Sequence, residues 1–313
     1  MKQKNEITGV GLGLRWEFID EILERKPELA FVEISPENYI GRGGWYDAAL
    51  ERAMDVWPIV THGLTMSLGG VDPLREDYLA DLRRFLERTK SPWHSDHLCF
   101  STYGGVVLHE LLPIPFKRSE VARVADRIKR AQDAIGVPLA IENVSFYLHP
   151  GKPEMTEAEF VARVCEAADC GLMLDVNNAW VNATNFGWDV DEWMRTVPLD
   201  RVVQMHVAGH DWFTEGDFVL GERPADLSKA RGEMMIVDTH GNDVAAEVLA
   251  LLERTLEKTG PVPVLLERDQ SIPPLDVLLA EVRRIEEVWN RACARHLRQS
   301  SGRPAGAEEA ARR

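Results

Sequence analysis

Short apolar segments rich in β-branched residues alternate with long amphipathic segments along most of the chain, and no other feature constrains the fold as strongly. The alternation gives eight strand–helix units, with predicted strands at residues 10–14, 29–34, 58–63, 92–98, 138–143, 172–178, 201–207 and 262–268. Strands that alternate with helices form parallel sheets with both faces covered. Eight such units are typical of a closed (β/α)8 barrel, which needs about 250 residues.

An open, doubly wound α/β sheet is the alternative architecture, because strand order cannot be deduced from a single sequence. The first strand lies in GVGLGLR (9–15), which lacks the GxGxxG dinucleotide fingerprint, and the sequence contains no P-loop. We therefore predict one α/β domain, a TIM barrel over residues 1–297. Residues 298–313 are small, polar and charged, and we predict that they form a disordered tail.

The composition indicates which partners and which cellular compartment to expect. Lys and Arg total 36 against 51 Asp and Glu, a formal net charge of −15, which repels nucleic acids and anionic membranes. No apolar run approaches the roughly 20 residues of a membrane-spanning helix, and the N-terminus lacks the apolar core of an export signal. Four cysteines without metal-finger spacing do not make a disulfide scaffold, so we expect a cytoplasmic protein.

Metal-ligating and proton-transferring residues stand at the ends of the predicted strands. The carboxyl ends of the strands carry the active site in (β/α)8 barrels. Seven consecutive predicted strands end in such residues, which are Glu33, His62, Asp96 with His97, Glu142 with Asn143, Asp175 with Asn177, His206, and Glu267. The loop after the seventh strand adds His210, Asp238 and His240.

At least four imidazoles and four carboxylates would therefore meet at one rim of the barrel. Without cations, that many carboxylates would repel each other and raise their own pKa values. Divalent metals remove this repulsion, because carboxylates can bridge two ions and imidazoles can complete each coordination sphere. We predict a multinuclear metal site, and the alternative is a barrel mouth that is merely polar.

The spacing within two motifs supports this prediction. Asp238 and His240 are two residues apart, so both side chains face the same way if the segment is extended. Asp175 and Asn177 have the same relation at the end of the sixth strand.

His94 and His97 are three residues apart on the fourth predicted strand, so only one of them can face the pocket. His97 is nearer to the end of the strand. We therefore assign His97 to the site and treat His94 as a structural or pocket-edge residue.

Seven segments, taken in order, resemble a known family. They are THGLTMSLGG, SDHLCF, IENVSFY, LDVNNAWVNATNFG, QMHVAGH, VDTHG and LLERD. The ordered set is similar to the multinuclear non-heme iron-dependent oxidative enzymes, over roughly residues 9–290. The resemblance implies a TIM barrel related to the xylose-isomerase-like metal barrels. His94 before SDHL departs from the family pattern, which has an apolar or small residue there.

The resemblance also implies roles for individual residues. The implied metal ligands are His62, His97, Glu142, Asp175, Asn177, His206, Asp238, His240 and Glu267. Asp96 and Asn143 flank ligands and would support them from outside the coordination sphere, and His210 would line the pocket. The implied cofactor is two or three iron ions of mixed Fe(II) and Fe(III) state, and the co-substrate is O2.

The implied reaction is oxidation of a residue, most often cysteine, in a ribosomally made precursor peptide. Family members commonly work with a small partner protein that recognises the leader of the precursor, so a heterodimer is expected. Aromatic residues after the sixth and seventh strands could grip the peptide or seal the barrel mouth, and these are Trp180, Phe186, Trp188 and Trp212.

Two other functions are compatible with the same residues. A zinc or manganese hydrolase or isomerase on this barrel would use a similar ring of ligands, and spacing alone does not separate iron from zinc. A metal-dependent binding protein without turnover is the second alternative, because an open coordination position cannot be deduced from sequence.

Overall fold

The fold is a closed barrel of parallel strands. The computed structural model describes residues 7–214, 217–219 and 234–301. Its barrel has the strand order β1-β13-β9-β8-β7-β4-β3-β2. These strands are β1 (Val10–Gly13), β2 (Val32–Ile34), β3 (Ile59–Gly63), β4 (His94–His97), β7 (Leu139–Glu142), β8 (Gly171–Asp175), β9 (Val202–Val207) and β13 (Val264–Leu266). The predicted (β/α)8 barrel is confirmed, and the open sheet is excluded.

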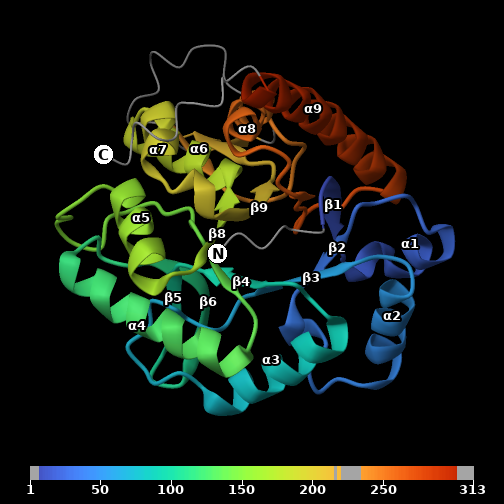
Figure 1. The fold of residues 1–313 in the computed structure, drawn as a ribbon, viewed down its shortest axis with the longest axis horizontal. Helices are drawn as coiled ribbons and strands as arrows, with labels where there is room; N and C mark the ends of the chain where they lie inside the picture. Colours follow the sequence, from blue (N-terminus) through green and yellow to red (C-terminus); the bar gives the residue numbers. More distant parts are fainter. Residues whose placement is uncertain (1–6, 215–216, 220–233, 302–313) are drawn as a thin grey trace.

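Helices surround the barrel (Figure 1). They are α1 (Ile19–Arg25), α2 (Gly44–Met54), α3 (Glu76–Thr89), α4 (Arg118–Ile135), α5 (Glu157–Ala168), α6 (Val176–Phe186), α7 (Val190–Thr196), α8 (Ala246–Thr259) and α9 (Leu275–Ser301), with short 3-10 turns at η1 (Trp16–Phe18), η2 (Pro36–Asn38) and η3 (Leu199–Arg201). None of the helices in the described ranges combines the length and the apolar character that crossing a membrane requires.

Helix α9 continues past residue 297, where we placed the end of the domain. Residues 298–301 are therefore helical, and the rest of the predicted tail lies outside the described residues. The long amphipathic run that begins at Leu275 explains this extension, because good helix formers carry the periodic pattern up to the serines.

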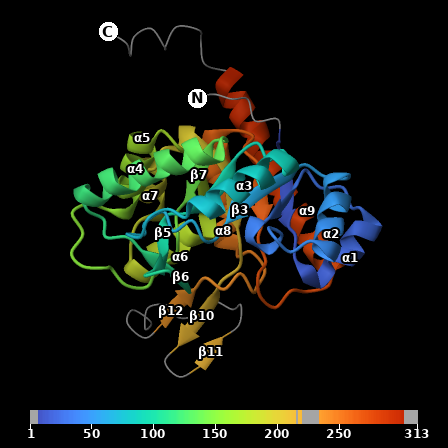
Figure 2. The same cartoon turned by 90° about the horizontal axis from the view of Figure 1, so that it is seen from below.

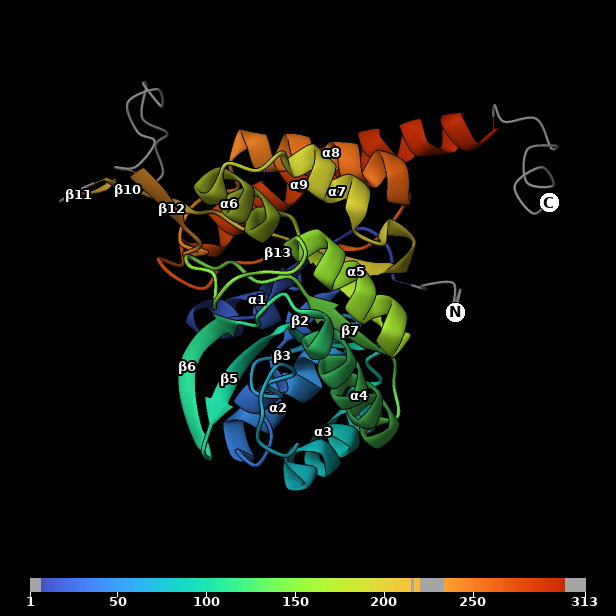
Figure 3. The same cartoon turned by 90° about the vertical axis from the view of Figure 1, so that its left-hand side faces the viewer.

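Two β-structures interrupt the predicted strand–helix alternation. A ribbon of β5 (Cys99–Tyr103) and β6 (Val106–Pro113) follows β4 directly. A three-stranded sheet of β10 (Asp211–Thr214), β11 (Asp217–Val219) and β12 (Met234–Val237) follows β9. Figures 2 and 3 show both on the same side of the barrel, away from the C-terminal end of α9. Both insertions start from carboxyl ends of barrel strands.

The barrel interior changes from apolar to polar along its axis. Phe31, Val60, Trp93 and Leu265 form a buried cluster, with Val60 and Leu265 on β3 and β13 and Phe31 and Trp93 directly before β2 and β4. Side chains two residues apart on a strand point to the same side. The next inward-facing positions are therefore Glu33, His62, Ser95 and Glu267, all buried. An apolar plug thus closes the barrel below a layer of buried polar residues.

The sixth predicted strand is shorter than expected. It ends at Asp175, and α6 begins at the next residue. Asp175 is the N-cap of this helix, and its Oδ1 accepts a hydrogen bond of 2.6 Å from the Asn178 backbone N–H. The prediction that Asp175 and Asn177 lie on one extended segment is therefore wrong, because the Asp side chain caps a helix that starts immediately after the strand.

Candidate metal centre

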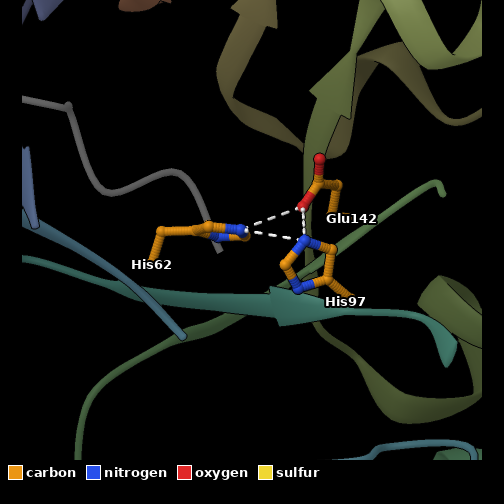
Figure 4. A group of neighbouring side chains, drawn as sticks. All are labelled: His62, His97 and Glu142. Carbon is orange, nitrogen blue, oxygen red and sulfur yellow. Dashed lines mark hydrogen bonds and ion pairs between the residues drawn. The ribbon is translucent and has the colours of Figure 1, made fainter. Parts of the chain in front are cut away.

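Three side chains from three neighbouring strands converge on one point at the carboxyl end of the barrel (Figure 4). The Nε2 atoms of His62 and His97 lie 3.3 Å apart. Oε2 of Glu142 lies 3.1 Å from the first nitrogen and 3.0 Å from the second. All three residues are buried. This arrangement matches two imidazoles and one carboxylate that surround a cation.

Neighbouring polar groups fix the orientation of both imidazoles. Nδ1 of His97 lies 3.1 Å from the carbonyl oxygen of Gly63. Because a carbonyl only accepts, this Nδ1 carries the proton and Nε2 is left with its lone pair. Nδ1 of His62 lies 2.8 Å from the hydroxyl of Ser95. Such contacts on the far side of the ring are typical of metal-ligating histidines.

Two further groups of potential ligands extend the first one across the barrel. The second consists of Glu142, Asp175 and His206, and the third of Asp175, His240 and Glu267. In each group the ligand atoms lie within 4.8 Å of one another. Glu142 belongs to the first and second groups, and Asp175 to the second and third. The two shared carboxylates therefore stand where bridges between adjacent metal ions would be needed.

His206 connects the third group to the barrel interior. Its Nδ1 lies 3.0 Å from Oε2 of Glu267, and its Nε2 lies 3.1 Å from Oε2 of Glu33. The amide of Gln204 donates a 2.6 Å hydrogen bond to Glu33, and Trp93 donates a 3.0 Å hydrogen bond to Gln204. The chain of contacts thus runs from the apolar plug to the candidate metal ligands.

Asn177 and Asp238 lie beside the third group. Nδ2 of Asn177 donates a 2.8 Å hydrogen bond to Oδ1 of Asp238, and Oδ1 of Asn177 lies 2.8 Å from Nδ1 of His210. Oδ1 of Asp238 is also 2.8 Å from Nε2 of His240. Asp238 and His240 therefore meet as predicted, but for a different reason: the backbone at His240 is left-handed, with φ of 49°, and is not extended.

Asn143 and Asp96 lie outside the three groups. The Asn143 side chain donates to the backbone carbonyl of Asp175 (2.9 Å) and accepts from its N–H (3.0 Å), which fixes the end of β8. Asp96 accepts from the backbone N–H groups of Met66 (3.2 Å) and His97 (2.8 Å). Because it is adjacent to His97 on β4, the Asp96 side chain lies on the opposite side of the strand.

The pKa values show that the carboxylates are balanced by protonated imidazoles when no metal is bound. Burial lowers the pKa of His62, but attraction to Glu142 outweighs it and raises the pKa to about 9. Burial also lowers the pKa values of His206 and His240, and the facing carboxylates again reverse the direction and raise both values well above the usual range. Burial, with repulsion from Glu142, raises the pKa of Asp175 well above its usual range.

Three buried atoms of the groups lack a hydrogen bond of normal geometry among the described residues. Oδ2 of Asp175 has no hydrogen-bond partner, and Oε2 of Glu142 and Nε2 of His240 make only the ion-pair contacts described above. Unpartnered buried polar atoms are costly, and a bound ion is one of the few explanations for them. The donor set of imidazole nitrogens and carboxylate oxygens, without a thiolate, fits a first-row transition metal.

Some residues that support the site were not singled out from the sequence. Ser95 and Gln204 each stand two residues before a candidate ligand, so the strand period could have indicated that they face the same way. Tyr147 accepts a 3.0 Å hydrogen bond from the Asp238 backbone N–H, and Ser145 donates one of 3.2 Å to the Asp238 side chain. Both lie in the loop after β7, within the segment IENVSFY that carries part of the family resemblance, and that motif was the available signal.

A comparison with known protein families matches residues 9–290 to the family described as RiPP precursor modification enzyme MbnB/TglH/ChrH. This span contains all the barrel strands and every residue of the three groups. The chain belongs to this family. Its members modify RiPP precursors, the ribosomally synthesised peptides that are altered after translation, so membership identifies the chain as a peptide-modifying enzyme.

Relatives of similar length support the family assignment. A UPF0276 protein of Acinetobacter baylyi is 40% identical over 281 residues, which covers 90% of this chain and 91% of that protein. A UPF0276 protein of Anaeromyxobacter sp. is 38% identical over 288 residues, with coverage of 92% and 95%.

Solved structures show a wider likeness in fold. An L-ribulose 3-epimerase superposes with a TM-score of 0.56 at 11% identity and covers 95% of this chain and 100% of its own. A xylose isomerase domain protein from Planctomyces limnophilus gives 0.55 at 15% identity, with coverage of 92% and 99%. Identities this low concern the fold alone, and the expected xylose-isomerase-like barrel is confirmed.

The aromatic residues near the mouth of this family member are mostly engaged in packing. Phe186 and Trp188 stack with ring centroids 4.9 Å apart. Trp212 packs with Val181 and Ile236 in a small buried cluster. These contacts match the sealing role that the sequence left open, whereas Tyr147 keeps 41% of its surface exposed beside the site.

Metal binding is expected to release protons and to strengthen as the pH rises. A ligating imidazole must be neutral, and the pKa of His62 is raised to about 9 in the metal-free site. Below about pH 9 the ion that binds in the first group must therefore displace this proton, so its affinity falls as the pH falls. A chelator competition with Zn²⁺ from about pH 6.5 to about pH 8.5 measures the effect, and an affinity independent of pH would contradict it.

Replacing the two histidines of β4 separates metal binding from packing. His97→Ala removes an imidazole that faces Glu142, so we expect it to lose at least one metal ion per chain. His94 has its Nδ1 3.1 Å from the Thr61 hydroxyl on the other side of β4, so His94→Ala is expected to keep the metal and to lose about 1–3 kcal/mol of stability. Metal analysis and urea unfolding test both variants, and equal metal loss would show that our assignment of strand faces is wrong.

Proposed function

We propose that this enzyme is a multinuclear iron-dependent oxidase that uses O2 to modify a residue, in this family most often cysteine, of a ribosomally synthesised precursor peptide. The observation that carries the proposal is the row of three ligand groups joined by Glu142 and Asp175. A single catalytic metal needs about three protein ligands and no bridging carboxylate. Two shared carboxylates are instead suited to adjacent ions.

The donor set fits iron. Two imidazoles and one carboxylate are the ligands of O2-using non-heme Fe(II) sites. Catalytic zinc takes similar ligands, so the choice of iron follows from the family resemblance described above. All four cysteines are free and buried, and none belongs to a ligand group of the described residues. Bound iron would supply the one-electron chemistry of O2 reduction that amino-acid side chains lack. Free cysteines also agree with a cytoplasmic location, which we infer.

We propose the following roles for the candidate residues. Ligation is assigned to His62, His97, Glu142, Asp175, Asn177, His206, Asp238, His240 and Glu267. Asn143 holds the backbone of Asp175, and His210 orients Asn177 through a 2.8 Å contact. We assign Asp96 to the support of β4, since its carboxylate accepts the N–H of His97.

Loss of either shared carboxylate is expected to lower the iron content sharply and to abolish activity. After anaerobic loading with Fe(II), the enzyme should hold more than one iron per chain and consume O2 with a cysteine-containing precursor encoded beside its gene. Glu142→Ala and Asp175→Ala each remove a ligand from two groups, so iron content should fall by more than one ion. Elemental analysis, an oxygen electrode and peptide mass spectrometry provide the measurements.

Exposed carboxylates serve as matched controls for these variants. Glu24→Ala and Asp55→Ala remove the same groups from α1 and from the end of α2, and should leave iron and turnover unchanged. Full iron loading in Glu142→Ala and Asp175→Ala would contradict the bridging roles. Turnover with zinc or manganese in place of iron, without O2 uptake, would instead support a hydrolase or isomerase.

We further propose that a small leader-recognition protein forms a heterodimer with this enzyme. Exposed apolar residues lie on both insertions, with Tyr103 and Val106 on the ribbon and Phe213 and Met235 on the three-stranded sheet. Exposed apolar groups on projecting elements are typical of contact surfaces. The net charge of −15 would speed the encounter with a basic partner or leader.

The enzyme paired with the product of a neighbouring gene should modify the full-length precursor faster than the enzyme alone. Because electrostatic steering is screened by salt, the advantage should shrink as ionic strength rises. Mass spectrometry of the precursor at matched enzyme concentrations measures both rates. Equal rates for the single enzyme and the pair would rule out the partner.

A further inference from the structure

The three ligand groups differ in how the fold supplies them. Every member of the first two groups lies on a barrel strand, namely β3, β4, β7, β8 or β9. The third group also needs His240, which lies beyond β12 in the segment of residues 238–243. The third group therefore exists only when this segment is held over the mouth of the barrel.

The backbone of this segment is held in an uncommon conformation. His240 has a φ of 49°, in the left-handed region that side-chain-bearing residues rarely adopt. Its N–H donates a 3.0 Å hydrogen bond to the carbonyl of Gly209, and its carbonyl accepts one of 3.0 Å from the N–H of Asp269. Surrounding contacts must maintain such a conformation, because it is unfavourable by itself.

Gly209 lets the segment approach the end of β9 closely. A Cβ atom at this position would overlap the backbone carbonyl of Asn242 and crowd that of Asp243. Backbone atoms cannot rotate away as a flexible side chain can. Any side chain at residue 209 would therefore push the segment, and His240 with it, away from Asp175 and Glu267.

Asp211 holds the same segment from the first residue of β10. Its buried carboxylate accepts a 2.6 Å hydrogen bond from the Thr239 hydroxyl through Oδ2. Its Oδ1 accepts a second hydrogen bond from the side-chain amide of Asn242. The two donors stand on either side of His240 in the chain, so one carboxylate fixes the backbone before and after the candidate ligand.

We propose that Gly209 and Asp211 form a clamp that assembles the third metal subsite, and that the first two subsites form without it. This inference rests on the proposed metal centre. Both are positioning residues, since neither belongs to a ligand group. A substitution at Gly209 or Asp211 should therefore change the iron content by one ion, although neither residue ligates a metal.

The far end of the segment has a separate anchor. The guanidinium of Arg268 is buried and lies 2.7 Å from Oδ1 of Asp243. The carboxylate of Glu281 on α9 accepts a 2.6 Å hydrogen bond from the N–H of Val244. Because these contacts do not involve the clamp, we expect clamp variants to displace the segment locally and to keep the barrel folded.

The experiment compares alanine substitutions of two glycines, one at residue 209 after β9 and one at residue 241 in the segment of residues 238–243. Gly209→Ala introduces the overlap with Asn242, whereas a Cβ at Gly241 would have its nearest neighbours at 3.5 and 3.6 Å, an ordinary contact. After anaerobic loading with excess Fe(II) and desalting, we expect Gly209→Ala to hold one iron fewer per chain than the wild type. Gly241→Ala should equal the wild type, and elemental analysis gives the counts.

Asp211→Ala provides a second test that does not depend on steric overlap. It removes both carboxylate acceptors, so the Thr239 hydroxyl and the Asn242 amide lose the group that holds them. The expected result is the same loss of one iron, with cooperative thermal unfolding that shows the variant to be folded. This variant decides the question if Gly209→Ala does not fold.

Two results would overturn the clamp. One is a wild-type iron count in the folded variants, and the other is loss of all iron from a folded variant, which would show that the subsites are not separable. A wild-type enzyme that binds no more than one iron would instead overturn the proposed multinuclear centre. The variants thus test the clamp, whereas the wild-type enzyme tests the multinuclear centre.

Discussion

Repulsion among buried carboxylates is the constraint on which the rest of this structure depends. Glu142, Asp175 and Glu267 are almost fully buried within one barrel mouth, where negative charges cannot be left uncompensated. Without metal, protonated imidazoles of His62 and His206 supply the balancing charge. A set of metal ions would replace those protons. The same residues therefore serve as a stable protonated cluster and as a site prepared for cations.

The (β/α)8 barrel can hold several buried carboxylates because its strands are rigid and their carboxyl ends converge on one rim. Parallel strands bring side chains from distant parts of the chain to one rim, and the apolar plug around Phe31 and Trp93 excludes water from below. Hydrogen bonds from Gln204 to Glu33 extend the polar layer down to that plug. Only the third group departs from this scheme, since it borrows His240 from an insertion. In the proposed metal centre, that difference would make one subsite more sensitive to loop contacts than the others.

Membership of the RiPP-modifying family indicates the substrate class of the site, and the two β-insertions lie beside it. The β5–β6 ribbon starts immediately after the strand of His97, and the β10–β12 sheet leads directly into Asp238 and His240. Both insertions lie on the same side of the barrel (Figure 3). A peptide bound between or beside the two insertions would therefore lie close to the candidate ligands.

The sequence by itself determined the eight-unit barrel and most of the site, because strand ends in this fold meet at one rim whatever the loops do. The strand ends predicted that His62, His97 and Glu267 lie at one rim, where the structure brings them, and the period of two separated His97 from His94. Only the tertiary structure decided the turn at Asp175, the left-handed backbone at His240 and the contacts of Gly209 and Asp211. These depend on contacts between segments far apart in the chain, which no local pattern encodes.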